Sequence, residues 1–83
     1  MGRHIVVIEG WNEGFNKVGS TKTIRDTFGC GLKESKDYAD QIMDGKVVSF
    51  EFSQKVDAQT FVERMKALGV VVRVVDEGQL ING

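Results

Sequence analysis

The stretch KVGSTKTIRDTFGCGLKESK, residues 17–36, predicts two helices joined by a short turn. Its first part, residues 18–28, carries apolar or β-branched residues at helical spacing, and a second pattern of this kind begins at Leu32. Gly29 suits the end of the first helix, because glycine readily adopts the left-handed conformation of a helix C-cap. Gly31 is expected to let the chain turn sharply, so the stretch predicts a helix hairpin with a very short joint. The residues expected to share one face of each helix are Val18, Thr21, Ile24 and Phe28, then Leu32, Ser35, Ala39 and Ile42.

Three β-branched runs surround this hairpin and predict strands over residues 4–9, 46–52 and 70–75. Residues 10–16 contain two glycines and two asparagines, a composition that is typical of a loop. Side chains alternate between the two faces of a strand. Alternation in the second run therefore predicts one shared face for Val48, Phe50 and Phe52.

A third helix is predicted between the second and third strands. Ser53 or Asp57 is suited to cap its start, and Gly69 is suited to end it. The element order is then β-α-α-β-α-β, which predicts an α+β fold: a two-layer domain in which a three-stranded sheet is covered by three helices. We expect this single domain to occupy residues 1–76, followed by a flexible tail over 77–83. The third helix is expected to bury Ala58, Phe61, Met65 and Leu68.

Length, composition and the pattern of apolar residues exclude several classes of protein. The chain has 83 residues, enough for one small core, and 11 Lys and Arg residues against 12 Asp and Glu give a net charge of −1. A single cysteine excludes an internal disulfide, and no apolar run approaches the roughly 20 residues of a membrane span. The start of the chain, MGRHIVVIEG, lacks the long apolar region of a signal peptide. We therefore expect a cytoplasmic protein with no membrane partner.

The basic residues of the hairpin are unusually placed. A helix N-terminus carries about half a positive charge, so an exposed cation there costs about 0.3–1 kcal/mol. We expect Lys17 and Lys22 to flank or occupy the first turn of the first helix, with two further lysines in the first turns of the second. A solvated polar face, with Glu34 and Asp37 compensating the charge, is one explanation. The repetition at two helix starts instead favours a patch that receives an acidic helix or groove of a partner. The residues of this predicted patch are Lys22, Arg25, Lys33 and Lys36.

Residues with catalytic chemistry are sparse. The Gly29-Cys30-Gly31 segment lacks the Gly-Lys-Ser/Thr ending of a phosphate-binding loop and the third glycine of a dinucleotide fingerprint. Cys30 is either a reactive thiol near a helix N-terminus or a small apolar residue beneath the turn. The single histidine, His4, is expected in a strand, so no Cys-His or Ser-His-Asp set can be assembled. We predict no enzyme, no metal and no cofactor.

The hairpin resembles the C-terminal domain of the bacterial ribosomal stalk protein family. That family carries a Lys-Val start, a Lys-x-x-Arg step and then Thr-Gly-x-Gly-Leu-Lys-Glu-Ala-Lys-Asp. The segment DAQTFVERMKALGVVVRVV, residues 57–75, is also similar to the last helix and final strand of the family, and the family has the β-α-α-β-α-β order. The residues that carry the resemblance in the hairpin are Lys17-Val18, Lys22, Arg25 and the run FGCGLKESKD over 28–37.

The resemblance implies a binding module that recruits translational GTPases, meaning elongation, initiation and release factors, or another host factor. The chain shows neither the N-terminal dimerisation helices nor the Ala/Gly-rich hinge of the family. It is therefore expected to act as a free-standing stalk head, of the kind a virus or mobile element would encode, as a decoy or modulator of translation. Thr21 stands where the family has an aliphatic residue, so we expect a retuned surface. The residues implied to contact the partner are Lys17, Val18, Thr21, Lys22, Arg25, Gly31, Leu32, Lys33, Glu34 and Lys36.

Two other binding functions stay open. A protease-adaptor protein that binds substrates has this fold, and nucleic acid could bind the basic hairpin, although the near-zero net charge argues against nucleic acid. The role of Trp11 is also open. Together with Phe15 in the predicted loop, it either folds back over the core or anchors a partner, since Trp is enriched at interface hot spots.

Overall fold

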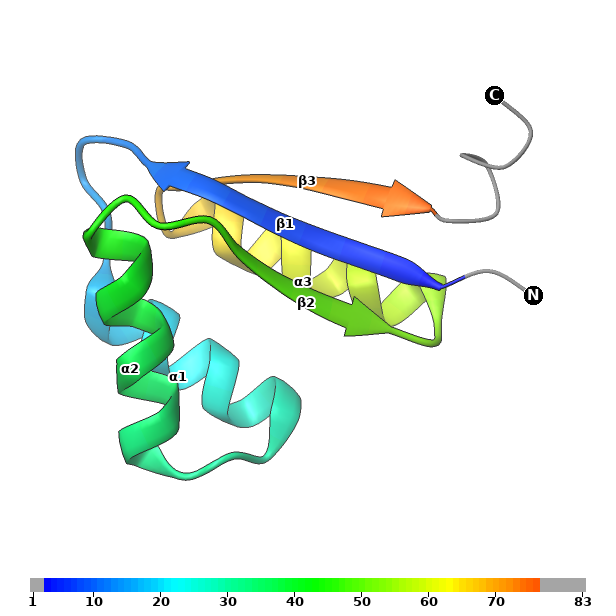
Figure 1. The fold of residues 1–83 in the computed structure, drawn as a ribbon, viewed down its shortest axis with the longest axis horizontal. Coiled ribbons are helices and arrows are strands. Elements are labelled where there is room, and N and C mark those ends of the chain that lie inside the picture. The colour runs from blue at the N-terminus through cyan, green and yellow to red at the C-terminus, as the bar shows by residue number, and fades with distance from the viewer. Residues whose placement is uncertain (1–2, 77–83) are drawn as a thin grey trace.

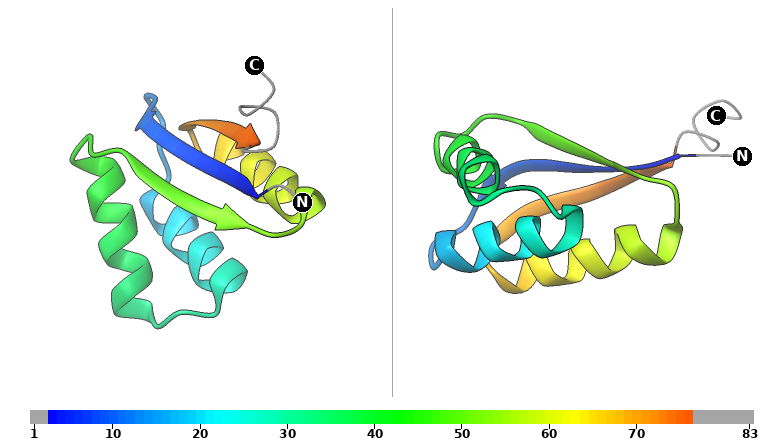
Figure 2. Two further views of the ribbon diagram at one scale, coloured as in Figure 1. Left: turned by 45° about the vertical axis from the view of Figure 1, so that its right-hand side comes forward. Right: turned by 90° about the horizontal axis from the view of Figure 1, so that it is seen from below.

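The computed structural model describes residues 3–76 and has the predicted α+β order (Figure 1). The predicted flexible tail, residues 77–83, lies outside the described residues. The helices are on one face of the sheet, and the hairpin of the first two helices sits beside the third (Figures 1 and 2). In chain order the elements are β1 (His4–Trp11), α1 (Lys17–Phe28), α2 (Leu32–Met43), β2 (Val48–Phe52), α3 (Lys55–Ala67) and β3 (Val70–Asp76).

The sheet is antiparallel in the order β2-β1-β3, so β1 lies in the centre. Val6 of β1 faces Phe50 of β2 and Val74 of β3, which fixes the register on both sides. The pairing of β1 with β3 shifts between Ile8 and Gly10, so Glu9 is the extra residue of a β-bulge. The bulge lets β1 continue to Trp11, whereas the sequence predicted a strand end at Glu9 and a loop from Gly10.

The core fills the space between the sheet and the helices. As alternation predicted, Val48, Phe50 and Phe52 of β2 are all buried on the helix-facing side. Phe61 of α3 lies edge-on to Phe50, with ring centroids 5.4 Å apart, and Phe28 stacks on Phe50 at 4.8 Å. An aromatic cluster therefore joins the end of α1 to β2 and α3, consistent with the preference of aromatic pairs for offset and edge-to-face geometry.

The predicted helix faces are correct in part. Ile24 and Ile42 are completely buried, but Val18 and Leu32, assigned to the same faces, are 81% and 61% exposed. Ser20 is fully buried instead, because α1 packs against α2 on one side and α3 on the other. The prediction for α3 holds for Ala58, Phe61 and Met65, with Val62 also buried and Leu68 partly buried.

The helix ends agree with the prediction at Gly29 and differ from it at Gly31 and at the start of α3. Gly29 adopts the left-handed conformation expected of a C-cap, with φ 64°. Gly31, in contrast, has an ordinary extended conformation with φ −68°, so the turn does not depend on glycine there. The N-cap of α3 is Gln54, not Ser53 or Asp57. Asp57 lies in the first turn, where the helix dipole stabilises a carboxylate.

The second strand is shorter than predicted. It begins at Val48, two residues after the predicted start, because Gly45 has φ 80° and the chain leaves α2 through a turn. Across residues 3–76, none of the helices has the length and apolar character that crossing a bilayer requires.

Candidate docking groove on the helix hairpin

Local hydrogen bonds hold the ends of the hairpin. At the start of α1 the Asn16 side chain accepts a hydrogen bond from the Gly19 backbone N–H at 2.8 Å, which satisfies one of the free donors of the first turn. At the end of α1 the Gly29 N–H donates to the Arg25 carbonyl at 2.8 Å. Both ends of α1 are thus fixed by residues that the chain places next to them.

The turn between the two helices is closed by Cys30 and Ser35. The Ser35 hydroxyl donates to the Gly31 carbonyl at 2.9 Å, and the Cys30 sulfur lies 3.0 Å from the same hydroxyl. Cys30 is partly buried and packs against the core. These contacts match the interpretation of Cys30 as a small packing residue beneath the turn.

An open groove of about 780 Å³ runs along the hairpin between α1 and the first half of α2. Of the predicted contact residues, all except Gly31, Lys33 and Glu34 line it. Asp26 also lines it and was not predicted. The sequence could have indicated Asp26, because it follows Lys22 by four residues. Residues four apart are neighbours on a helix surface, so Asp26 lies beside a predicted contact residue. The lining residues are Lys17, Val18, Thr21, Lys22, Arg25, Asp26, Leu32 and Lys36.

The groove combines exposed apolar side chains with basic ones. Val18 comes from α1 and Leu32 from α2, and both are more than half exposed. No ion pair is found for Lys22, Arg25 or Lys36 within residues 3–76. The groove therefore offers two apolar contacts and three cations that form no ion pair within the described residues, and it also contains the Asp26 carboxylate.

Thr21 presents a less polar surface to the groove than a threonine with a free hydroxyl would. Its hydroxyl donates a hydrogen bond to the Lys17 carbonyl one turn earlier, at 2.9 Å. The donor is therefore satisfied inside α1 and does not need a partner. Thr21 can line an apolar surface with little desolvation cost, since buried hydroxyls are costly only when they are unpaired.

The structure confirms the predicted place of Lys17 and corrects that of Lys22. Lys17 is the first residue of α1, as expected, and its ion pair with Asp40 of α2 compensates its charge within the hairpin. Lys22 is the sixth residue of α1 and lies in the second turn, where the dipole has little effect. Lys33 does occupy the first turn of α2, next to Glu34 in the same turn.

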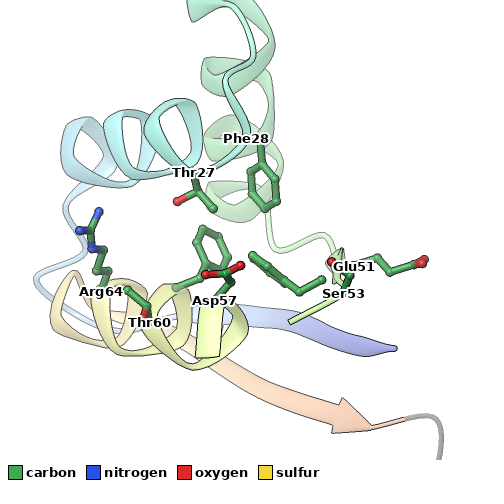
Figure 3. Close-up of a pocket in the computed structure, with 9 residues that line it drawn as sticks. Thr27, Phe28, Glu51, Ser53, Asp57, Thr60 and Arg64 are labelled. Atoms are coloured by element: carbon green, nitrogen blue, oxygen red, sulfur yellow. The ribbon is translucent and has the colours of Figure 1, made fainter. Parts of the chain in front are cut away.

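A second hollow of about 410 Å³ lies between the end of α1, the end of β2 and α3 (Figure 3). In Figure 3, Thr27 and Phe28 of α1 face Asp57, Thr60 and Arg64 of α3 across it. Its aromatic base belongs to the core cluster, because the Phe28 ring lies 5.4 Å from the rings of both Phe52 and Phe61. The lining residues are Thr27, Phe28, Glu51, Phe52, Ser53, Asp57, Thr60, Phe61 and Arg64.

Trp11 lies away from both hollows, at the end of β1. Its indole N–H donates to the Met43 carbonyl at 3.1 Å, its ring is tilted 6.0 Å from that of Phe15, and the residue is 44% exposed. The expectation that Trp11 is either a core residue or a free anchor is therefore too simple. It ties β1 to the end of α2 and leaves part of its surface in solvent.

The described residues contain no group of His, Cys, Asp and Glu side chains that could hold a metal ion. No family model, curated protein or solved structure matches the chain. The α+β fold and the groove on its hairpin are thus the observations from which a function can be argued.

Proposed function

We propose that the chain is a non-enzymatic protein-binding module that uses the groove of the α1–α2 hairpin. The observation that carries the proposal is the exposure of Val18 and Leu32, at 81% and 61%, in a groove with three cations that form no ion pair within residues 3–76. Full burial of one such side chain contributes about 1.5–3 kcal/mol. A partner that covers both would therefore gain an apolar contact that the isolated chain leaves unused.

The chemistry of the groove indicates the kind of partner. Lys22, Arg25 and Lys36 line the same groove as the two apolar residues, so the matching surface combines apolar residues with Asp or Glu. An amphipathic acidic helix meets this description, because a helix presents such residues at three- and four-residue spacing. We propose that the charges set the rate and specificity of docking, and that Val18 and Leu32 supply most of the contact energy.

The resemblance of the hairpin to the ribosomal stalk head supports a translational GTPase as that partner. The Lys-Val start, the Lys22 and Arg25 step and Leu32 all fall on the groove. A module that binds these factors through such a groove would compete for them with ribosomal stalks. We therefore propose a decoy or modulator of translation.

The proposal is tested by titrating purified bacterial elongation, initiation and release factors with the wild-type protein and with a Lys22/Lys36 double alanine variant. The expected result is saturable binding by at least one factor, with affinity at least tenfold lower for the variant. A Lys46/Lys55 double alanine variant removes the same charge from exposed positions outside the groove. Absence of binding by every factor, or equal loss in both variants, would contradict the proposal.

A nucleic-acid partner predicts a different salt response. Phosphate contacts make affinity fall steeply with salt, by about one power of the salt concentration for each phosphate neutralised. Docking of an acidic protein partner also weakens with salt, but we expect a shallower slope, because Val18 and Leu32 supply most of the contact energy. A titration with single-stranded and duplex oligonucleotides at several salt concentrations therefore separates the two classes of partner.

A further inference from the structure

The free edge of β3 is the feature that the docking groove does not use. Within residues 3–76, β3 pairs with β1 alone, so its other edge presents unpaired backbone N–H and C=O groups. Such an edge is a template for another strand unless charged side chains, above all lysine, or proline or a cover block it. The strand reads VVVRVVD, so its central residue Arg73 is charged, but it contains neither lysine nor proline, and Val71 and Val74 are 41% and 38% exposed.

We propose that β3 pairs antiparallel with β3 of a second copy of the chain, which joins two sheets into one six-stranded sheet. The symmetry of the strand favours a second copy as the partner. Antiparallel self-pairing about a two-fold axis sets each residue opposite its mirror position, so a strand that reads alike from both ends is matched to itself. Over residues 71–75, β3 is such a strand about Arg73, since Val72 mirrors Val74 and Val71 mirrors Val75, whereas the outermost pair sets Val70 opposite Asp76.

In this register, valines of the two copies lie opposite each other on both faces of the sheet. Val72 would face Val74 of the second copy on the helix side, and Val71 would face Val75 on the open side. Directly opposed β-branched residues of this kind stabilise antiparallel pairs. The full length of the strand, Val70–Asp76, takes part in this register, and any shift shortens the pairing.

Arg73 lies at the centre, where two copies of it would face each other. Its charge is already compensated, because the Arg73 Nε lies 3.0 Å from the Glu9 carboxylate of β1. Glu9 is the bulge residue, so the irregularity of β1 places a carboxylate beside the arginine. The two arginines therefore enter the pair as neutral Arg–Glu units, which removes most of the repulsion between them.

The opposite edge of the sheet is less suited to self-pairing. It is formed by β2, Val48–Phe52, which is shorter and reads VSFEF, with Glu51 held by Arg3 at 3.0 Å. The inference does not rest on the docking groove. The third helix packs against β3, whereas α2 lies toward the β2 side of the domain, so a β3 dimer leaves the groove of each copy uncovered (Figure 2).

The first experiment is sedimentation velocity of the full chain over a wide concentration range. We expect the weight-average mass to rise from the 9.2 kDa of one chain toward twice that value. A Val71→Lys variant places a charge on the edge and should return the mass to that of one chain. The control is Val47→Lys, since Val47 is 69% exposed and precedes β2, so this variant should associate like the wild type. A wild type that stays monomeric, or equal association of both variants, would overturn the proposal.

A second experiment tests the register and does not depend on whether Val71→Lys folds. Arg73→Cys is made together with Cys30→Ser, and the protein is mildly oxidised. Opposed residues of antiparallel strands have Cα atoms about 4.5–5.5 Å apart, within the range of about 4.4–6.8 Å that a disulfide spans. We expect covalent dimers from this variant and at least tenfold fewer from Ser49→Cys in the same background, since Ser49 lies on β2. Equal yields from the two variants, or none from either, would overturn the register.

Discussion

Lys17 Nζ and Asp40 Oδ1 form an ion pair that joins the first residue of α1 to the last part of α2. The pair lies at the end of the hairpin opposite the Gly29–Gly31 turn, so the two helices are tied at both ends. It also explains how a lysine is tolerated at a helix start, where an exposed cation costs about 0.3–1 kcal/mol. Lys17 lines the docking groove, but its charge already serves the fold.

Removing this ion pair should have a small effect on stability. Both side chains are more than a third exposed, and exposed pairs contribute about 0–1 kcal/mol. We expect Asp40→Asn to lower the free energy of unfolding by less than about 1 kcal/mol, with a smaller difference at high salt. Urea denaturation at two salt concentrations measures this. Asp37→Asn is the matched control on the same helix and should have no comparable salt-dependent cost. A salt-independent loss of several kcal/mol would show that Asp40 has another structural role.

The two N-caps of α1 and α3 should respond differently to alanine. The Asn16 side chain accepts a hydrogen bond from the Gly19 N–H, whereas Gln54 makes no side-chain cap hydrogen bond. Asn16→Ala should therefore cost about 0.5–2 kcal/mol. Gln54→Ala should be close to neutral, because no hydrogen bond is lost. Thermal unfolding of both variants tests the difference, and equal destabilisation by the two substitutions would be inconsistent with the cap geometry.

Two glycines with positive φ should differ in their tolerance of alanine. Gly29 has φ 64° with open space around an added Cβ, so Gly29→Ala should cost about 1–2 kcal/mol from backbone conformation alone. Gly69 has φ 84°, and a Cβ there would lie 3.0 Å from the Phe15 Cα. Since backbone cannot move aside as a flexible side chain does, Gly69→Ala should cost about 1 kcal/mol or more beyond the cost of Gly29→Ala.

Chemical denaturation of both glycine variants, with unchanged m-values, checks this order. The reverse order, with Gly29→Ala the more damaging substitution, would mean that the α1–α2 turn constrains the fold more strongly than the contact between Gly69 and the loop before α1.

Much of the fold follows from local patterns in the sequence. Alternation placed Val48, Phe50 and Phe52 on the buried side of β2, and Gly29 ends α1 as its chemistry predicts. These features depend on neighbours in the chain, which periodicity and capping preferences describe well.

The features that could not be predicted depend on distant residues. Val18 lies outside the core because α1 is shared between two neighbouring helices, an arrangement that helical spacing alone does not reveal. The extension of β1 through Gly10 and Trp11 depends on a bulge against β3, and the Lys17–Asp40 ion pair joins residues far apart in the sequence. Charge placement predicts Lys22, Arg25 and Lys36 of the groove, and the resemblance implies Lys17, Val18, Thr21 and Leu32 as well. Their grouping around an open groove is a property of the folded hairpin.

The most direct test of the docking groove compares Val18→Ala with Val56→Ala. Each valine is the second residue of its helix, and they are 81% and 65% exposed, so the substitutions are alike in chemistry and in effect on the fold. The measurement is the Kd of each variant for a translational GTPase that binds the wild type. We expect Val18→Ala to raise the Kd about tenfold, the value for a loss of about 1.4 kcal/mol, and Val56→Ala to leave it unchanged. A Kd that Val18→Ala leaves unchanged, or that both variants raise equally, would show that the groove is not the docking site.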